Sequence, residues 1–316
     1  MTAVVRTSRP VASHRARPGT APARRRRRWS GLLMAAPALL LFGLFGLVPL
    51  VGVLVLGLSR WDGLGSVGWA GFANWSGVLT DDTTWQALWL TLKVMLVSWL
   101  VQTPIALALG VFQAPKGRLR ALFAVLWFLP LLLSAVAIGL TWQALLDPSF
   151  GIGATPGLHW LANPLLGSPD LALYTVIFVI AWQFTPFHAL LYQAGIRQIP
   201  VSLYEAAAID GAGPVTRFLR ITLPQLKYTF VTSSTLMLVG SLTYFDLIYV
   251  LSGGTGGPGT ATRVLPLAMY ITGFQAHDMG RASAIATLLV VFGLALSLFT
   301  TRLSGFTRMD SQQEGL

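Results

Sequence analysis

Residues 201–225 read VSLYEAAAIDGAGPVTRFLRITLPQ and lie between two long apolar segments. Seven positions in this stretch follow the spacing EAA-x3-G-x9-I-x-LP, which begins at Glu205 and ends at Pro224. The alanines predict a helix, and Gly211 offers the left-handed residue that closes one. Pro214 suits the first position of a second helix. The stretch therefore predicts a short helix, a turn and another short helix.

The start of this stretch has a predicted form as well. Pro200 disfavours continued helix at Ile199. Ser202 stands three residues before Glu205, which is the spacing of a capping box. Two interpretations of these features are open. The stretch could be an ordinary helical hairpin at a membrane surface, or it could be a docking site, because small alanine side chains let a partner approach closely.

The composition of the chain is that of a polytopic membrane protein. Of its 316 residues, 54% are hydrophobic and only 10% are charged. Uncharged apolar runs recur, and one from Trp29 to Ser59 exceeds the roughly 20 residues that cross a bilayer as a helix. The chain has no Cys, and its four His residues show no ligand spacing. We expect an all-α membrane protein without disulfide, metal or cofactor.

Six transmembrane helices fit the apolar runs, and the basic residues set their orientation. The non-membrane segments 1–29, 113–120 and 196–227 and the C-terminal tail hold 18 of the 22 Lys and Arg residues. Basic loops stay in the cytosol, so both termini and the 196–227 loop are predicted to be cytosolic. The expected spans are 31–58, 87–112, 121–145, 171–195, 228–252 and 282–301.

The N-terminal tail carries much of the net charge of +11, with nine of the 22 basic residues before Trp29. Such a tract is typical of a topology anchor that contacts anionic membrane lipids. Nucleic-acid binding is disfavoured because no aromatic-interleaved module accompanies it. The long apolar run that follows disfavours a cleavable signal peptide. We expect residues 1–29 to be a disordered basic tail, 30–305 a six-span domain and 306–316 a cytosolic tail.

The spacing of the 201–225 stretch resembles the signature of the membrane permease subunits of binding-protein-dependent ABC importers. Further matches are GFANW at 71–75, FDLIYVL at 245–251 and GGP at 256–258. Together they are similar to the maltose-type and glycerol-phosphate-type sugar permeases, and the basic tail suits the first of two paired subunits. The chain is too short for the extra spans and the large periplasmic insertion of the best-known maltose-type first subunit.

This resemblance implies a type I ABC importer permease fold in a prokaryotic plasma membrane. It implies as partners a dimer of cytosolic ABC ATPase subunits, a second permease subunit that makes a heterodimer, an extracytoplasmic solute-binding protein and a sugar. The segment at 196–227 would receive the push from the ATPase. The coupling residues carried over in this way are Glu205, Ala206, Ala207, Ala208, Asp210, Gly211, Ile221, Leu223 and Pro224.

A few polar and aromatic residues within the spans are candidates for the sugar pathway. Aromatic faces and amide or carboxylate groups suit a sugar, and an ionisable group inside a membrane is a functional candidate by default. The candidates are Trp182, Gln183, Tyr244 and Asp246. Packing explains each one equally well, and Asp246 could instead tie neighbouring helices together by hydrogen bonds.

The chain contains no Gly-x4-Gly-Lys-Ser/Thr phosphate loop, so we do not expect it to hydrolyse ATP by that route. The sequence also shows no paired carboxylates, nucleophile elbow or metal cluster that would indicate an enzyme. Two other classes stay open beside the ABC permease. One is a secondary, ion-coupled transporter, for which six spans with one deep acidic residue fit poorly. The other is a membrane scaffold without transport, which would not require the patterned loop.

Overall fold

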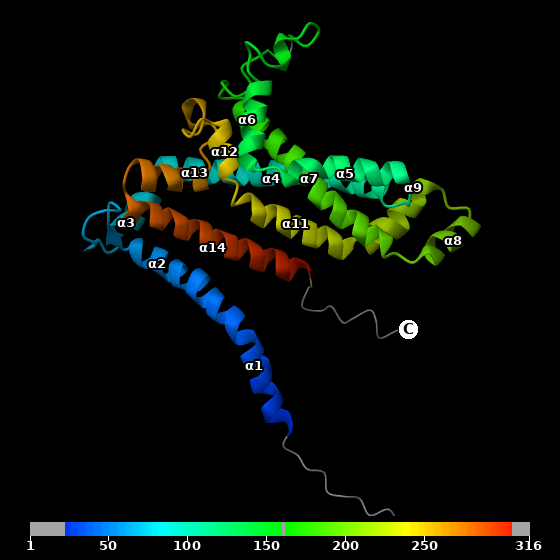
Figure 1. Cartoon of the computed structure of the whole chain (residues 1–316), viewed down its shortest axis with the longest axis horizontal. Coiled ribbons are helices and arrows are strands. Elements are labelled where there is room, and N and C mark those ends of the chain that lie inside the picture. The colour runs from blue at the N-terminus through cyan, green and yellow to red at the C-terminus, as the bar shows by residue number, and fades with distance from the viewer. Residues whose placement is uncertain (1–22, 160–161, 305–316) are drawn as a thin grey trace, which may run out of the picture. The chain divides into compact units, whose positions relative to one another are not determined.

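The computed structural model describes residues 23–159 and 162–304 and is shown in Figure 1. The described chain is mainly helical, and it divides at Gly52 into two units. The expected tails lie largely outside the described residues. The last part of the expected N-terminal tail is an exception, because helix α1 begins at Ala23.

The first unit consists of α1 (Ala23–Phe42), a π-helical turn η1 (Gly43–Leu47) and the beginning of α2 (Val48–Leu56). The apolar residues of α1, η1 and α2 provide a candidate membrane span of 24 residues at Leu33–Leu56, the end of which lies in the second unit. The two glycines of η1, Gly43 and Gly46, offer no side chain to resist the wider turn. The expected span at 31–58 is therefore helical but locally widened.

The second unit contains most of the helices and one small two-stranded sheet. Strand β1 (Ser59–Arg60) pairs antiparallel with β2 (Gly68–Trp69). The helices are α3 (Ala73–Leu79), α4 (Asp82–Gln113), α5 (Arg118–Leu132), α6 (Ala135–Leu145), α7 (Ala172–Arg197), α8 (Val201–Ile209), α9 (Pro214–Arg217), α10 (Leu223–Gln225), α11 (Lys227–Ser241), α12 (Asp246–Leu251), α13 (Leu265–Tyr270) and α14 (Met279–Ser304). Shorter turns are the 3-10 helices η2 (Ile152–Ala154) and η5 (Pro258–Thr260) and the π-helices η4 (Phe218–Thr222) and η6 (Ile271–Gln275).

Helix α7 forms the centre of this unit, and it packs along α4. Gly110 of α4 allows the close approach, because a Cβ there would lie 2.6 Å from the Cβ of Tyr192. The C-terminal ends of the two helices meet: Gln193 Nε2 donates to the carbonyl oxygen of Gln113 over 2.8 Å, and Arg197 Nε donates to that of Ala114 over 3.0 Å. Helices α4 and α7 therefore lie side by side and run in the same direction.

The N-terminal ends of α4 and α14 also lie together. Asp81 caps α4 by accepting a hydrogen bond from the backbone N–H of Thr83, and its Oδ2 lies 2.6 Å from Arg281 Nη2. Burial by itself would raise the pKa of Asp81, but the hydrogen bonds from Thr83 and Thr84 and the nearby Arg281 bring it below the usual value. The contact joins residues 200 positions apart, and it holds the starts of α4 and α14 together.

Two expected spans are not single continuous helices. The span at 121–145 is bent by 98° between α5 and α6, because Leu133 is extended and the Ser134 side chain accepts the N–H of Ala137 to start a new helix. The span at 228–252 is interrupted at residues 242–245. Within the described ranges, four helices are long and apolar enough to cross a membrane, or five if the bent pair counts as one.

Candidate functional site

The patterned segment 201–225 forms an exposed helix, turn and helix, as predicted. Helix α8 ends in a Schellman arrangement: the N–H of Ala212 donates to the carbonyl of Ala207 over 2.8 Å, and the N–H of Gly211 donates to that of Ala208 over 3.1 Å. Gly211 has φ +71°, a conformation that glycine adopts without a steric penalty. Pro214 is the first residue of α9. The predictions for Gly211 and Pro214 are confirmed.

The predicted capping box at the start of α8 is wrong. Helix α8 begins at Val201, so Ser202 lies inside its first turn, and no side chain caps it. The reason is that Pro200 lies just outside the helix with φ −57° and its carbonyl already accepts the N–H of Leu203. Glu205 is consequently an exposed residue in the middle of the helix.

The two halves of the patterned segment are braced against each other. The hydroxyl groups of Tyr204 and Thr222 lie 2.9 Å apart, and Arg217 Nε donates to the carbonyl of Ala212 over 2.7 Å. Thr222 is buried, whereas Ile221 on the same π-helix is half-buried. These contacts hold α8 and the α9–α10 segment in one fixed arrangement.

The outer side of the segment carries exposed apolar side chains that have no partner in the described chain. Ile209 is 88% exposed and Val215 is 69% exposed. Among the predicted coupling residues, Glu205, Ala206, Ala208, Asp210, Gly211, Leu223 and Pro224 are exposed, while Ala207 and Ile221 are half-buried. Apolar side chains this exposed beside small alanines are typical of a protein interaction site.

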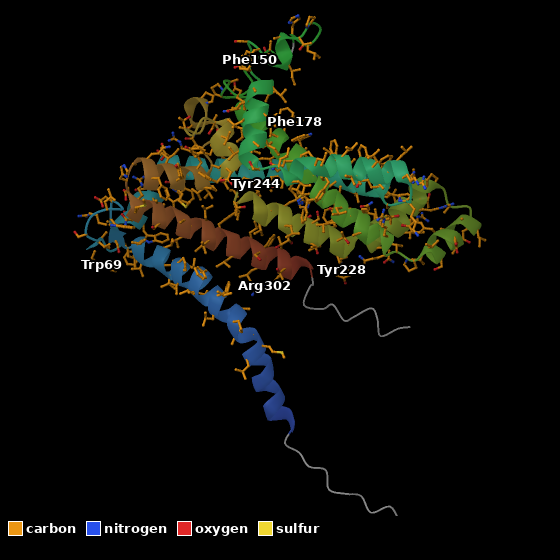
Figure 2. All side chains as sticks on the ribbon, viewed as in Figure 1. Trp69, Phe150, Phe178, Tyr228, Tyr244 and Arg302 are labelled. Carbon is orange, nitrogen blue, oxygen red and sulfur yellow. The ribbon has the colours of Figure 1, made fainter. Side chains whose placement is uncertain are left out.

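A second candidate site is a cavity of about 410 Å³ beside the two helix breaks. The turn at 242–245 supplies Thr243, Tyr244 and Phe245, and α12 begins with Asp246. Helix α7 supplies Phe184 and His188, and the α5–α6 bend supplies Leu131 and Ala135. Tyr244 lies where the helices come together, whereas Phe150 lies in the segment that follows α6 (Figure 2).

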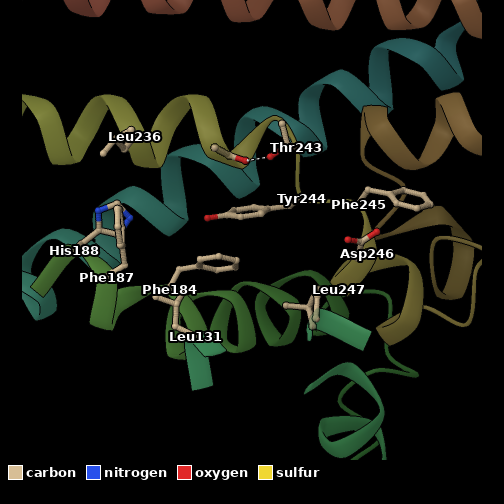
Figure 3. Close-up of a pocket in the computed structure, with 12 residues that line it drawn as sticks. Leu131, Phe184, Phe187, His188, Leu236, Thr243, Tyr244, Phe245, Asp246 and Leu247 are labelled. Atoms are coloured by element: carbon tan, nitrogen blue, oxygen red, sulfur yellow. Dashed lines mark hydrogen bonds between the residues drawn. The ribbon is translucent and has the colours of Figure 1, made fainter. Parts of the chain in front are cut away.

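The cavity has an aromatic floor and polar groups at its two ends (Figure 3). The rings of Phe184 and Tyr244 lie 5.2 Å apart at an angle of 32°, and the Tyr244 hydroxyl points toward the side where His188 lies. His188 Nδ1 lies 3.0 Å from Ser233 Oγ. Asp246 lies at the opposite end. The arrangement offers ring faces together with hydrogen-bonding groups.

The structure divides the four predicted pathway residues into two pairs. Tyr244 and Asp246 line the cavity. Trp182 instead packs edge-to-face on Trp142 with ring centres 5.4 Å apart. Gln183 is 3% exposed, and its Oε1 has no hydrogen-bond partner in the described part of the chain. Neither of the latter two is among the residues lining this cavity.

Asp246 is not held as a tie between helices. It is exposed and starts α12 directly after the chain break, where the helix dipole favours a negative charge. Within the described ranges its carboxylate has no hydrogen-bond or ion-pair partner. The interruption at 242–245 therefore leaves the Asp246 carboxylate free to face the cavity.

Sequence reasoning missed Phe184 and Thr243 as lining residues, and it missed Gln102 of α4. Gln102 is 1% exposed, and its side-chain amide lies near the Tyr244 hydroxyl. A buried amide in a long apolar run is the signal that could have identified it, since buried polar groups without partners are costly.

Parallel long helices, broken helices around a cavity and an exposed helical hairpin are the features of a membrane transport subunit. The family of binding-protein-dependent transport system inner membrane components matches residues 102–308, and the chain belongs to it. It is 32% identical to the trehalose/maltose transport system permease protein MalF of Thermococcus litoralis, over 88% of this chain and 94% of that protein. It is 31% identical to the lactose transport system permease protein LacF of Rhizobium radiobacter, over 85% and 92%.

The fold has a counterpart among solved structures. A bacterial ABC transporter involved in the import of the acidic polysaccharide alginate contains a chain that superposes with a TM-score of 0.76. The match covers 90% of this chain and 98% of that chain at 24% sequence identity. The likeness shows a common ABC importer permease fold.

Proposed function

We propose that the protein is one of two permease subunits of an ABC sugar importer. The observation that carries the proposal is the exposed hairpin 201–225, whose two halves are held together by the Tyr204–Thr222 hydrogen bond. The chain that carries this hairpin belongs to a family of transport-system membrane components. The sugar class is supported by relatives that are named for trehalose, maltose and lactose transport. We infer that the chain forms half of the translocation pathway and has no nucleotide site of its own.

The hairpin would dock on a cytosolic ATPase dimer. Exposed Ile209 and Val215 provide apolar contact area, and the alanines allow close approach. The fixed Schellman ending at Gly211 would let a displacement of α8 pass to α7 and α11, because the segment continues directly into both. The remaining partners in this proposal are a second permease subunit and an extracytoplasmic solute-binding protein.

The cavity beside the helix breaks would form part of the sugar pathway. Phe184 and Tyr244 offer ring faces for the C–H side of a sugar, and Asp246 offers a charged acceptor for its hydroxyl groups. Hydrogen bonds to a charged acceptor are stronger than neutral ones. Gln183 would contribute only if the helices rearrange, since it does not line the cavity.

The importer assignment predicts that uptake needs the whole assembly. The chain is to be reconstituted in vesicles with a second permease, the ATPase dimer and a solute-binding protein encoded beside it. We expect sugar uptake and sugar-stimulated ATP hydrolysis only from the complete set, because each step is supplied by a different subunit. Uptake by the single chain, driven by an ion gradient alone, would instead indicate a secondary transporter.

The proposed topology has six spans, with both termini and the 196–227 loop in the cytosol. The bent α5–α6 pair would serve as the third span, and α11 with α12 as the fifth. Because the chain has no Cys, single cysteines at Ser66 and Gly213 report their side directly. Both positions are exposed, so we expect an impermeant thiol reagent applied outside intact cells to label only Ser66→Cys. External labelling of Gly213→Cys would rule this topology out.

A further inference from the structure

A cavity of about 650 Å³ lies where the C-terminal ends of α4 and α7 meet the start of α8. Its walls include apolar side chains from three segments, among them Val111, Ile199 and Val201. Two cationic side chains, Lys116 and Arg197, line it as well. The cavity thus combines an apolar surface with concentrated positive charge.

The two cations have no acidic partner within the described part of the chain. Arg197 is anchored, because its Nε and Nη2 donate to the carbonyl oxygens of Ala114 and Gln113 over 3.0 and 3.4 Å. A cation is favourable at these negative helix ends. Lys116 is exposed and makes no hydrogen bond in the described structure. Neither cation is paired with a carboxylate in the described structure, so an anion could bind beside them.

We propose that this cavity binds an anionic phospholipid. The headgroup phosphate would lie at Lys116 and Arg197, and the first part of an acyl chain would lie against the apolar wall. Basic pockets between helix ends suit anionic headgroups, and the apolar wall favours a lipid over a free anion. An acidic segment of the ATPase would match the charge but would not require the apolar wall of Val111 and Ile199.

The bound lipid would support the hairpin from its inner side. Tyr204 and Thr222 also line the cavity, and their hydrogen bond braces α8. Each of them is next to a coupling position, Glu205 and Ile221. A lipid in the cavity would fill the space beneath this brace, so the headgroup composition of the membrane would regulate coupling.

The binding test uses the full chain purified in detergent and titrated with dioleoylphosphatidylglycerol during native mass spectrometry. Lys116→Gln should weaken binding about fivefold, as expected for one basic side chain beside an anionic headgroup. Arg118→Gln is the matched control, since Arg118 is exposed and only two positions away but does not line the cavity. It should bind like the unmodified chain.

Further measurements distinguish a bound phospholipid from other ligands of the cavity and control for misfolding of a variant. Val201→Trp fills the cavity from a residue that is 67% exposed, so it should lower binding while leaving both cations in place. Dioleoylphosphatidylcholine and inorganic phosphate should bind weakly. Equal binding of either, or equal weakening by Arg118→Gln, would overturn the proposal. Loss of the lipid when the ATPase assembles would assign the cavity to the ATPase. None of these measurements depends on sugar transport. Failure of the lipid proposal can therefore be distinguished from failure of the importer assignment.

Discussion

Gly211→Val should lower sugar-stimulated ATP hydrolysis by the assembled transporter at least about tenfold while the chain still inserts into the membrane. Gly211 has φ +71°, and holding a β-branched residue in that region costs on the order of 1–3 kcal/mol. A Cβ there would meet no other atom within 4 Å, so the effect would come from the backbone alone. Helix α8 would then end differently, and the hairpin would lose its docking geometry.

Gly213→Val is the matched control for this prediction. Gly213 lies two positions away in the same turn, also has open space around its Cβ, and has φ −70°, which any residue can adopt. Hydrolysis by the assembled complex is measured with and without sugar-loaded binding protein. The docking assignment fails if the two variants behave alike, or if Gly211→Val keeps full coupling.

Asp246→Asn should reduce sugar uptake about tenfold or more without changing the affinity of the solute-binding protein for its sugar. The substitution keeps the shape of the side chain and removes its charge. A hydrogen bond to a charged group is worth about 1.5–3 kcal/mol, and roughly 1.4 kcal/mol corresponds to a factor of ten. The binding protein captures the sugar before Asp246 meets it, so only passage through the membrane should suffer.

Asp82→Asn controls for the general effect of removing an acid from a helix start. Asp82 is exposed in the first turn of α4, as Asp246 is in that of α12, but it does not line the cavity. Uptake is measured in vesicles together with the amount of assembled complex. Normal uptake by Asp246→Asn would show that the cavity needs no charge. Failure to assemble would give Asp246 a structural role instead.

The local features of the hairpin were predictable because local rules govern them. Gly211 and Pro214 adopt the predicted backbone positions, since few other residues suit a left-handed helix end or a first helical turn. The capping box failed for an equally local reason. Pro200 already stands at the start of the helix, where its carbonyl oxygen accepts the N–H of Leu203, so Ser202 lies inside the first turn and has no cap to make.

The amino-acid sequence by itself determined that this is a helical membrane protein with an exposed, patterned hairpin, because apolar run length and turn residues depend on neighbours in the chain. Only the tertiary structure decided where the long segments break, and that Tyr244 and Asp246 share a cavity from which Trp182 and Gln183 are separated. Which face of a helix turns toward a cavity depends on packing between segments far apart in sequence, such as the approach of Gly110 to Tyr192. No local pattern encodes that approach.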